Sequence, residues 1–211
     1  MISWSIAAAQ KSGCFDRVVV STDDPEIAAI ALAEGAEVPF LRPAALADDH
    51  TPTVPVIQHA INELTYQSTM PTEVCCIYAA APFVREVDIQ CGLKILLESG
   101  AAFAMTVTSY PYPIQRALRV TEVGRTQMID PKQVLTRSQD LEEAWHDAGQ
   151  FYWGTSAAWM SGIPLIGPDT CAVPLPRLRV QDIDTPEDWE VAEIKFRLLE
   201  SIQIEGRLKS F

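Results

Sequence analysis

Hydrophobic positions along the chain follow two spacings, one typical of helices and the other of strands. Apolar residues at helical spacing, or residues that cap a helix, mark five segments: 1–13, 23–35, 51–64, 85–100 and 186–205. Short apolar runs rich in β-branched or aromatic residues predict strands at 16–22, 102–110, 151–160 and 178–184, and a buried strand that runs into a loop at 73–82. A short extended piece is also expected at 36–43. Strand and helix therefore alternate along most of the chain.

This alternation predicts an α/β fold with a parallel or mostly parallel sheet and helices on both faces. The length of 211 residues suits one domain over residues 1–211. Residues 111–150 break the rhythm because they are polar, rich in turns and carry only weak strand signals. We expect an insertion or a dimerisation arm there.

Composition limits the class of protein. Hydrophobic residues make up 48% and charged residues 21%, as in globular proteins. A net charge of −12 argues against a nucleic-acid binder, which needs basic patches. No apolar run approaches the length of a membrane span, and the start lacks a signal-peptide pattern. The five cysteines show no metal-binding spacing, so we expect buried reduced thiols and a cytoplasmic location.

Two carboxylates stand where the last predicted strand ends and a helix begins. In an extended chain, Asp182 and Asp184 project to the same side while Ile183 faces the core. Thr185 and Asp188 have the spacing of a capping box, so Asp184 is not needed as the cap. Converging carboxylates repel unless a cation lies between them, and oxygen ligands suit Mg²⁺. We favour a Mg²⁺ site over a solvated turn.

The other strand ends offer weaker candidates. Asp24 is explained as a helix cap before Pro25, whereas Asp23 fits a site or a solvated surface equally well. Arg42 is the only arginine in an acidic and apolar stretch and could bind a phosphate or a ribose, with Thr51 and Thr53 as further donors. A surface pair with Asp48 or Asp49 explains Arg42 equally well.

Residues 137–154 hold the densest mixture of polar and aromatic side chains. Such a mixture is typical of a carbohydrate pocket, where aromatic faces cover the sugar and amides or imidazole bond its hydroxyls. We expect Phe151 and Trp153 to belong to the core instead. For His146, a satisfied structural pair with Asp147 is as good an explanation as a ligand contact. The polar candidates of this segment are Arg137, Gln139, His146 and Gln150.

Together these stretches resemble the acylneuraminate cytidylyltransferases, and most of all the branch that activates pseudaminic acid. The stretches that carry the resemblance run in the family's order over nearly the whole chain: "FDRVVVSTDDPEIA", "GAEVPFLRPAALADD", "YAAAPFV", "FAMTVTSYPYPIQRALR", "SQDLEEAWHDAGQFYWG" and "VQDIDTPEDWE". The resemblance implies a Rossmann-like three-layer α/β/α fold of the nucleotide-diphospho-sugar transferase type. It also implies transfer of CMP from CTP to a nonulosonic acid, for glycan biosynthesis by a Mg²⁺-dependent homodimer.

The resemblance assigns roles to particular residues. It implies that Asp182 and Asp184 bind the metal and that Arg137 is a further catalytic residue. It implies nucleotide contacts from Arg42, Thr51, Thr53, Ala79 and Ala80. It implies sugar contacts from Tyr78, Gln115, His146 and Gln150, with Arg137 in the same region.

Two departures from the family's pattern leave alternatives open. The family opens with a strand and a basic, glycine-containing loop that holds the CTP triphosphate, and this sequence begins after it, so we expect weak CTP binding by these residues alone. The loop 78–83 reads YAAAPF where the family usually has YPTAPF. One alternative is an inactive homologue that serves as a binding or dimerisation module. Another is a related enzyme that activates an octulosonate.

Overall fold

The computed structural model of the chain describes residues 1–204, with side chains to residue 202. Its helices are α1 (Ile2–Ser12), α2 (Pro25–Ala33), α3 (Thr53–Gln67), α4 (Glu86–Ser99), α5 (Ser156–Ser161) and α6 (Pro186–Ile204). Its strands are β1 (Glu73–Ile77), β2 (Phe103–Ser109), β3 (Leu118–Val120), β4 (Thr126–Met128), β5 (Trp145–Thr155) and β6 (Thr170–Pro174). The helices predicted from residues 1–13, 23–35, 51–64 and 85–100 are confirmed, and α6 matches the last prediction except for residue 205, which lies outside the described residues.

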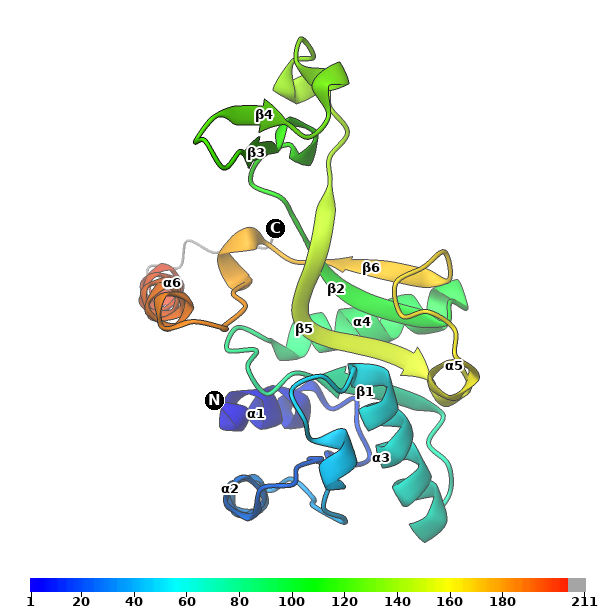
Figure 1. The fold of residues 1–211 in the computed structure, drawn as a ribbon. Coiled ribbons are helices and arrows are strands. Elements are labelled where there is room, and N and C mark those ends of the chain that lie inside the picture. Colours follow the sequence, from blue (N-terminus) through cyan, green and yellow to red (C-terminus); the bar gives the residue numbers. More distant parts are fainter. Residues whose placement is uncertain (205–211) are drawn as a thin grey trace.

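The main sheet has the strand order β1-β5-β2-β6 within residues 1–204 (Figure 1). β5 is antiparallel to both of its neighbours, whereas β2 and β6 are parallel. β1, β2 and β6 therefore run in one direction and β5 runs against them. The predicted α/β fold is confirmed, and the sheet is mixed because the long β5 is inserted between β1 and β2.

Helices cover both faces of this sheet because its strands are apolar on both sides. On one face, Ile89 and Leu96 of α4 pack with Phe151 and Trp153 of β5, together with Ala8 of α1. The core position predicted for the two aromatic residues is confirmed. α3 and α5 cover the opposite face; the residues buried there are Ile61, Phe103, Met105, Val107, Tyr152, Ala158 and Trp159. The alternation of side chains along β2 and β5 thus produces three layers.

Residues 111–144 leave the sheet as a projecting arm (Figure 1). The arm contains the hairpin of β3 and β4, which pair antiparallel from Leu118↔Met128 to Val120↔Thr126. These strands match the weak strand signals in the sequence. The chain enters the arm from the C-terminal end of β2 and returns directly into the N-terminal end of β5. Both connections of the arm therefore lie at the same end of these two neighbouring strands.

Two strand predictions were wrong, and a third, 151–160, was right only for residues 151–155, which belong to β5. Residues 16–22 form no regular strand; they are extended and make only an isolated parallel bridge, Val19↔Glu37, with the extended piece predicted at 36–43. Residues 156–160 belong to α5, because the Thr155 hydroxyl accepts a hydrogen bond from the Ala158 N–H and caps a helix. Residues 178–184 are not a strand; the strand parallel to β2 is β6, which lies earlier in the chain.

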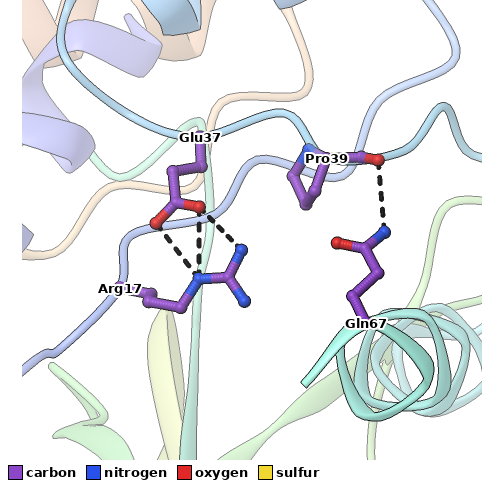
Figure 2. A network of polar contacts seen from close by, with 4 residues as sticks. All are labelled: Arg17, Glu37, Pro39 and Gln67. Atoms are coloured by element: carbon purple, nitrogen blue, oxygen red, sulfur yellow. Dashed lines mark hydrogen bonds and ion pairs between the residues drawn. The ribbon is translucent and has the colours of Figure 1, made fainter.

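An ion pair between Arg17 and Glu37 joins the two extended segments, residues 16–22 and 36–43 (Figure 2). Arg17 binds Glu37 through two guanidinium nitrogens, with the shortest contact at 2.6 Å, and this bond lowers the pKa of Glu37. Figure 2 also shows Gln67 of α3 donating to the Pro39 carbonyl at 3.4 Å. These contacts support the two extended segments from their exposed side.

Within the part of the chain that the structure describes, no helix is long and apolar enough to cross a bilayer. All five cysteines are free thiols. Burial raises the pKa of Cys76 to about 12 and raises the pKa of Cys75 as well. Cys91 is exposed on α4, so the expectation of buried thiols was wrong for this residue.

Candidate active site

A pocket of about 480 Å³ opens at the edge of the sheet where β1 and β2 end and β5 begins. The three strands of common direction point their carboxyl ends to this edge, which is where a ligand site was predicted. The residues that line the pocket are Tyr78, His146, Asp147, Ala148, Gly149, Tyr152, Val180, Gln181 and Asp182.

A β-bulge in β5 shapes one wall of the pocket. The register between β2 and β5 shifts between Met105 and Val107. Gly149 lies within the bulge at φ 60°, a left-handed conformation that favours glycine. The fully buried hydroxyl of Thr106 accepts hydrogen bonds from two backbone N–H groups of the bulge, at 3.3 and 3.4 Å. The bulge therefore turns residues 146–149 toward the pocket without leaving these N–H groups unpaired.

Two phenols and a carboxylate lie side by side on this wall. The Tyr152 hydroxyl donates to Asp147 Oδ2 at 2.7 Å, and Asp147 Oδ1 accepts the Gly149 N–H at 2.8 Å. Burial raises the pKa of Tyr152, and the bond to Asp147 raises it further, so this phenol stays protonated. The ring of Tyr78 lies 5.3 Å from that of Tyr152, and its hydroxyl is 2.7 Å from Thr53 Oγ1. The wall thus offers fixed hydroxyl groups to a ligand.

His146 is oriented by its own neighbours. Its Nδ1 lies 2.8 Å from the Asp147 carbonyl oxygen. Because a carbonyl can only accept, Nδ1 carries the proton and Nε2 of the neutral ring is an acceptor. The Tyr110 ring packs on the imidazole with 4.7 Å between centroids. The ring is therefore held by a backbone carbonyl and an aromatic face, and the pairing with the Asp147 side chain considered from the sequence is absent among the described contacts.

Asp182 and Asp184 are both exposed, and Ile183 between them packs with Phe83 and α6, as the extended spacing predicted. Asp182 lines the pocket, while Asp184 is not among its lining residues. The capping box is confirmed: Thr185 Oγ1 accepts the Asp188 N–H at 3.2 Å, and Asp188 Oδ2 accepts the Thr185 N–H at 2.9 Å. Asp184 is accordingly free of the capping role.

These carboxylates fit the donor chemistry of Mg²⁺. Neither of them accepts a hydrogen bond from the described part of the chain, so their oxygens are available. Within residues 1–204, no three His, Cys, Asp or Glu side chains converge as a metal site. Two carboxylates completed by water and substrate oxygens are the usual protein share of a Mg²⁺ site. Asp182 and Asp184 therefore suit a hard cation whose remaining ligands come from water and the substrate.

The predicted nucleotide contacts are only partly brought together. Thr53 reaches the pocket through Tyr78. Arg42 lies 3.4 Å from Asp23, and its buried Nε has no partner among the described residues. Thr51 donates to Asp48 at 2.8 Å, so Asp48 pairs with a threonine rather than with Arg42. Ala79 and Ala80 form the turn that follows β1.

The remaining predicted residues lie outside the pocket lining. Arg137 precedes a short 3-10 turn in the arm and is exposed. Gln115 donates to the Glu142 carbonyl at 2.9 Å, and Gln150 donates to the Arg179 carbonyl. Each of these two amides keeps a buried Oε1 with no hydrogen-bond partner among the described residues. Such atoms are uncommon in folded proteins and are available to a ligand or a water.

Comparison with protein families identifies the family to which this chain belongs. A family model described as cytidylyltransferase matches residues 1–158, three quarters of the chain. The chain belongs to the cytidylyltransferase family. It is therefore a nucleotidyltransferase, and the resemblance noted from the sequence is confirmed.

Individual relatives cover almost all of this cytidylyltransferase. A protein named pseudaminic acid cytidylyltransferase from Campylobacter jejuni serotype O:2 is 41% identical over 94% of this chain and 85% of its own length. Its counterpart from serotype O:23/36 is 39% identical over the same shares. A solved structure entitled CMP:2-keto-3-deoxy-manno-octonic acid synthetase complexed with CTP has a TM-score of 0.59 at 12% identity, over 94% of this chain and 88% of that chain, and shows the fold alone.

Sequence reasoning did not assign three pocket residues with polar side chains, Asp147, Tyr152 and Gln181. Tyr152 was noted only as one aromatic of a polar segment. The signal that could have found Asp147 and Tyr152 is Gly149, because a glycine inside a strand pattern suggests a bulge, and bulges re-aim side chains. Gln181 lies in the segment wrongly predicted as a strand, so its direction was not accessible.

Proposed function

We propose that this cytidylyltransferase transfers CMP from CTP to pseudaminic acid or a closely related nonulosonic acid, with Mg²⁺, for the synthesis of surface glycans. The observation that carries the proposal is the 41% identity to a protein of that name over nearly the full chain. A bond forms between the anomeric oxygen of the sugar and the α-phosphorus. The bond from that phosphorus to the bridging oxygen breaks, pyrophosphate leaves, and the hydroxyl proton is released.

The charge of the pocket supports a cation. Its lining includes Asp147 and Asp182, and none of the described lining residues is Lys or Arg. A sugar carboxylate and phosphates would be repelled there unless positive charge entered with them. Asp182 and Asp184 would hold Mg²⁺, which would offset the negative charge that develops on the phosphates.

The other lining groups suit a sugar. With the proton on Nδ1, His146 Nε2 can accept a hydrogen bond from a sugar hydroxyl, while Tyr78 offers a hydroxyl and an aromatic face. Asp147 Oδ2, already bound by Tyr152, can accept a further N–H or O–H of the ligand. A pocket with several acceptors and few donors favours a ligand rich in hydroxyl and acetamido groups.

Replacing either metal-binding candidate tests the reaction. Asp182→Asn and Asp184→Asn should each lower kcat/KM by at least about a hundredfold, because an amide holds a cation far less well than a carboxylate. Circular dichroism should show an unchanged fold. Asp16→Asn is the matched control and should keep its activity, because Asp16 is also exposed and is not among the residues that line the pocket. Normal Mg²⁺-dependent turnover by both test variants contradicts the assignment.

Substitutions in the pocket wall formed by β5 test which sugar the enzyme uses. His146→Ala should raise the KM for the sugar about tenfold, the value of one lost hydrogen bond, and leave the KM for CTP nearly unchanged. Gln150→Ala should act in the same direction, since Gln150 belongs to the same bulge and its Oε1 has no hydrogen-bond partner among the described residues. A change in the KM for CTP alone shows that the sugar pocket lies elsewhere. Preference of the wild type for an octulosonate contradicts the proposed substrate.

We further propose that the enzyme is a homodimer held by the arm. Several apolar side chains of the arm are exposed to solvent, although a monomeric protein would be expected to bury them. Their exposed fractions are 57% for Leu118, 69% for Val120, 80% for Val123 and 92% for Leu135. A second copy of the chain is the partner that such a surface suits, because most soluble oligomers are symmetric homo-oligomers.

A further inference from the structure

The segment that carries Asp182 has no strand to hold it, yet side chains grip it from three elements. Arg179 forms a two-nitrogen ion pair with Asp88 of α4, and both side chains are nearly buried, at 12% and 13% exposure. The Arg179 carbonyl accepts the side-chain amide of Gln150 from β5. Lys195 of α6 reaches the next two residues. The segment is therefore fixed by side chains instead of a backbone ladder.

Lys195 begins a chain of hydrogen bonds that reaches both aspartates. Its ammonium donates to the Val180 carbonyl at 2.7 Å and to Gln181 Oε1 at 2.8 Å. Gln181 Nε2 in turn donates to the Asp182 carbonyl at 2.9 Å and to Asp188 Oδ1 at 3.2 Å.

The far end of this chain is the capping carboxylate of α6. Asp188 Oδ2 accepts the Asp184 N–H at 3.3 Å, in addition to its bonds with Thr185. The backbone of Asp182 is thus reached through one amide, and the backbone of Asp184 through that amide and one carboxylate.

The ammonium is compatible with only one orientation of the Gln181 amide. Because an ammonium has no acceptor, it can face only Oε1, and this leaves Nε2 to bond the Asp182 carbonyl. Both acceptors of Nε2, the Asp182 carbonyl and Asp188 Oδ1, require the same orientation. Lys195 therefore adds a third contact that holds the amide in place, and its bond to the Val180 carbonyl ties the adjoining backbone to α6. Lys195 is not among the residues that line the pocket, but it bonds two that are, Val180 and Gln181, so its effect on a ligand would pass through these two residues.

We propose that Lys195 is a positioning residue that aims Asp182 and Asp184 at the metal of the proposed reaction. The inference rests on the proposed Mg²⁺ site and concerns a residue outside it. The partial burial of the ammonium, which lowers the pKa of Lys195, shows that this side chain is not a solvated surface lysine. Groups that orient metal ligands in this way typically change metal affinity by about 10–100-fold when removed.

The test compares Lys195→Met with Lys195→Arg in the full chain. Methionine keeps the apolar stem and removes every donor, whereas arginine keeps the charge and donors. Mn²⁺ is the probe, and free Mn²⁺ is counted by electron paramagnetic resonance. Lys195→Met should weaken Mn²⁺ binding about tenfold or more, and Lys195→Arg should restore most of it. Lys94→Met is the control, because Lys94 is 71% exposed and, among the described residues, pairs only with Glu98 on α4.

A second readout separates positioning from general stability. Hydrogen exchange in peptides covering residues 179–188 should accelerate in Lys195→Met, while exchange in β2 and β5 stays at the wild-type rate. In an Asp182→Asn/Asp184→Asn background, Lys195→Met should have no further effect on Mn²⁺ binding. Unchanged Mn²⁺ affinity in Lys195→Met, or faster exchange throughout the sheet, overturns the proposal.

Failure of the proposed function would be visible separately. If the wild type binds no Mn²⁺, the metal site is wrong, and exchange over residues 179–188 then decides alone whether Lys195 positions this segment. Unchanged exchange in Lys195→Met under that outcome also overturns the proposal.

Discussion

The four-stranded sheet and the arm use apolar side chains in opposite ways. Phe103 and Trp153 in the sheet are 1% and 2% exposed, packed between helices on two faces. Val123 and Leu135 in the arm are 80% and 92% exposed. Burial of apolar area stabilises a fold, so the sheet contributes to the stability of the single chain and these arm residues contribute little. The difference teaches that apolar composition alone does not say what a segment is for.

A substitution at Gly154, where the backbone of β5 packs closely against two aromatic rings, should have the largest effect on the free energy of unfolding. A Cβ at Gly154 would lie 2.5 Å from Phe103 Cδ1 and 2.7 Å from Trp159 Nε1, and both rings are buried. Gly154→Ala should therefore lower the free energy of unfolding by about 3 kcal/mol, measured by urea denaturation.

Gly167→Ala is the matched control for that substitution. Its nearest neighbour would be 3.7 Å away, and its φ is not in the left-handed region. This variant should stay within about 0.5 kcal/mol of the wild type. Equal losses for both glycines would show that packing around Gly154 is looser than the structure indicates.

The hydroxyl of Tyr152 should give a smaller effect that depends on pH. Tyr152→Phe removes the bond to Asp147 and should cost about 1 kcal/mol near neutral pH. Because the folded pKa of Tyr152 is raised, the wild type holds this stabilisation below about pH 10 and loses it as pH rises further.

Unfolding curves at a series of alkaline pH values check this expectation. The stability of the variant should fall less steeply than that of the wild type above about pH 10. Parallel curves for the two proteins would mean that this phenol titrates alike in the folded and unfolded chains.

The arm should give the smallest effect on the stability of the chain itself. Leu135→Asp should change the free energy of unfolding by less than about 0.5 kcal/mol at dilutions where the wild type is monomeric. The same variant should shift the molar mass from dimer to monomer in light scattering behind a sizing column. A wild type that is monomeric at every concentration contradicts the proposed dimer, and a large loss of stability contradicts the comparison of arm and sheet.

Elements with strong local signals were predictable from the sequence. α2 begins at Asp24 and Pro25 as its capping residues indicate, and the buried runs of β1 and β2 are strands. β6 was missed because it is short and ends in Pro174, a residue that weakens a strand prediction. Residues 178–184 alternate like a strand, but a 3-10 turn at Arg177–Arg179 and the ion pair with Asp88 hold them otherwise. Such long-range contacts are not visible in a local pattern.

The site was predictable to a similar degree. Tyr78, His146 and Asp182 were named from the sequence, and the structure brings them to one pocket. The arm places Arg137 away from the pocket lining within a single chain, which local sequence could not reveal. Lys195 gives no signal at all, because a lysine on an acidic helix is indistinguishable from a solvated one until its carbonyl partner is known.

The position of β5 between β1 and β2 has a consequence for the order of folding. β1 and β2 precede the arm in the sequence, but β5, the strand that pairs with both of them, comes only at residues 145–155, after the whole arm. During synthesis, β1 and the facing side of β2 have open edges until that segment emerges. Pairings of such long sequence separation form late and leave apolar edges exposed while they wait. β1 and β2 can therefore join one sheet only after β5 has been synthesised, and β6 then adds to the other side of β2.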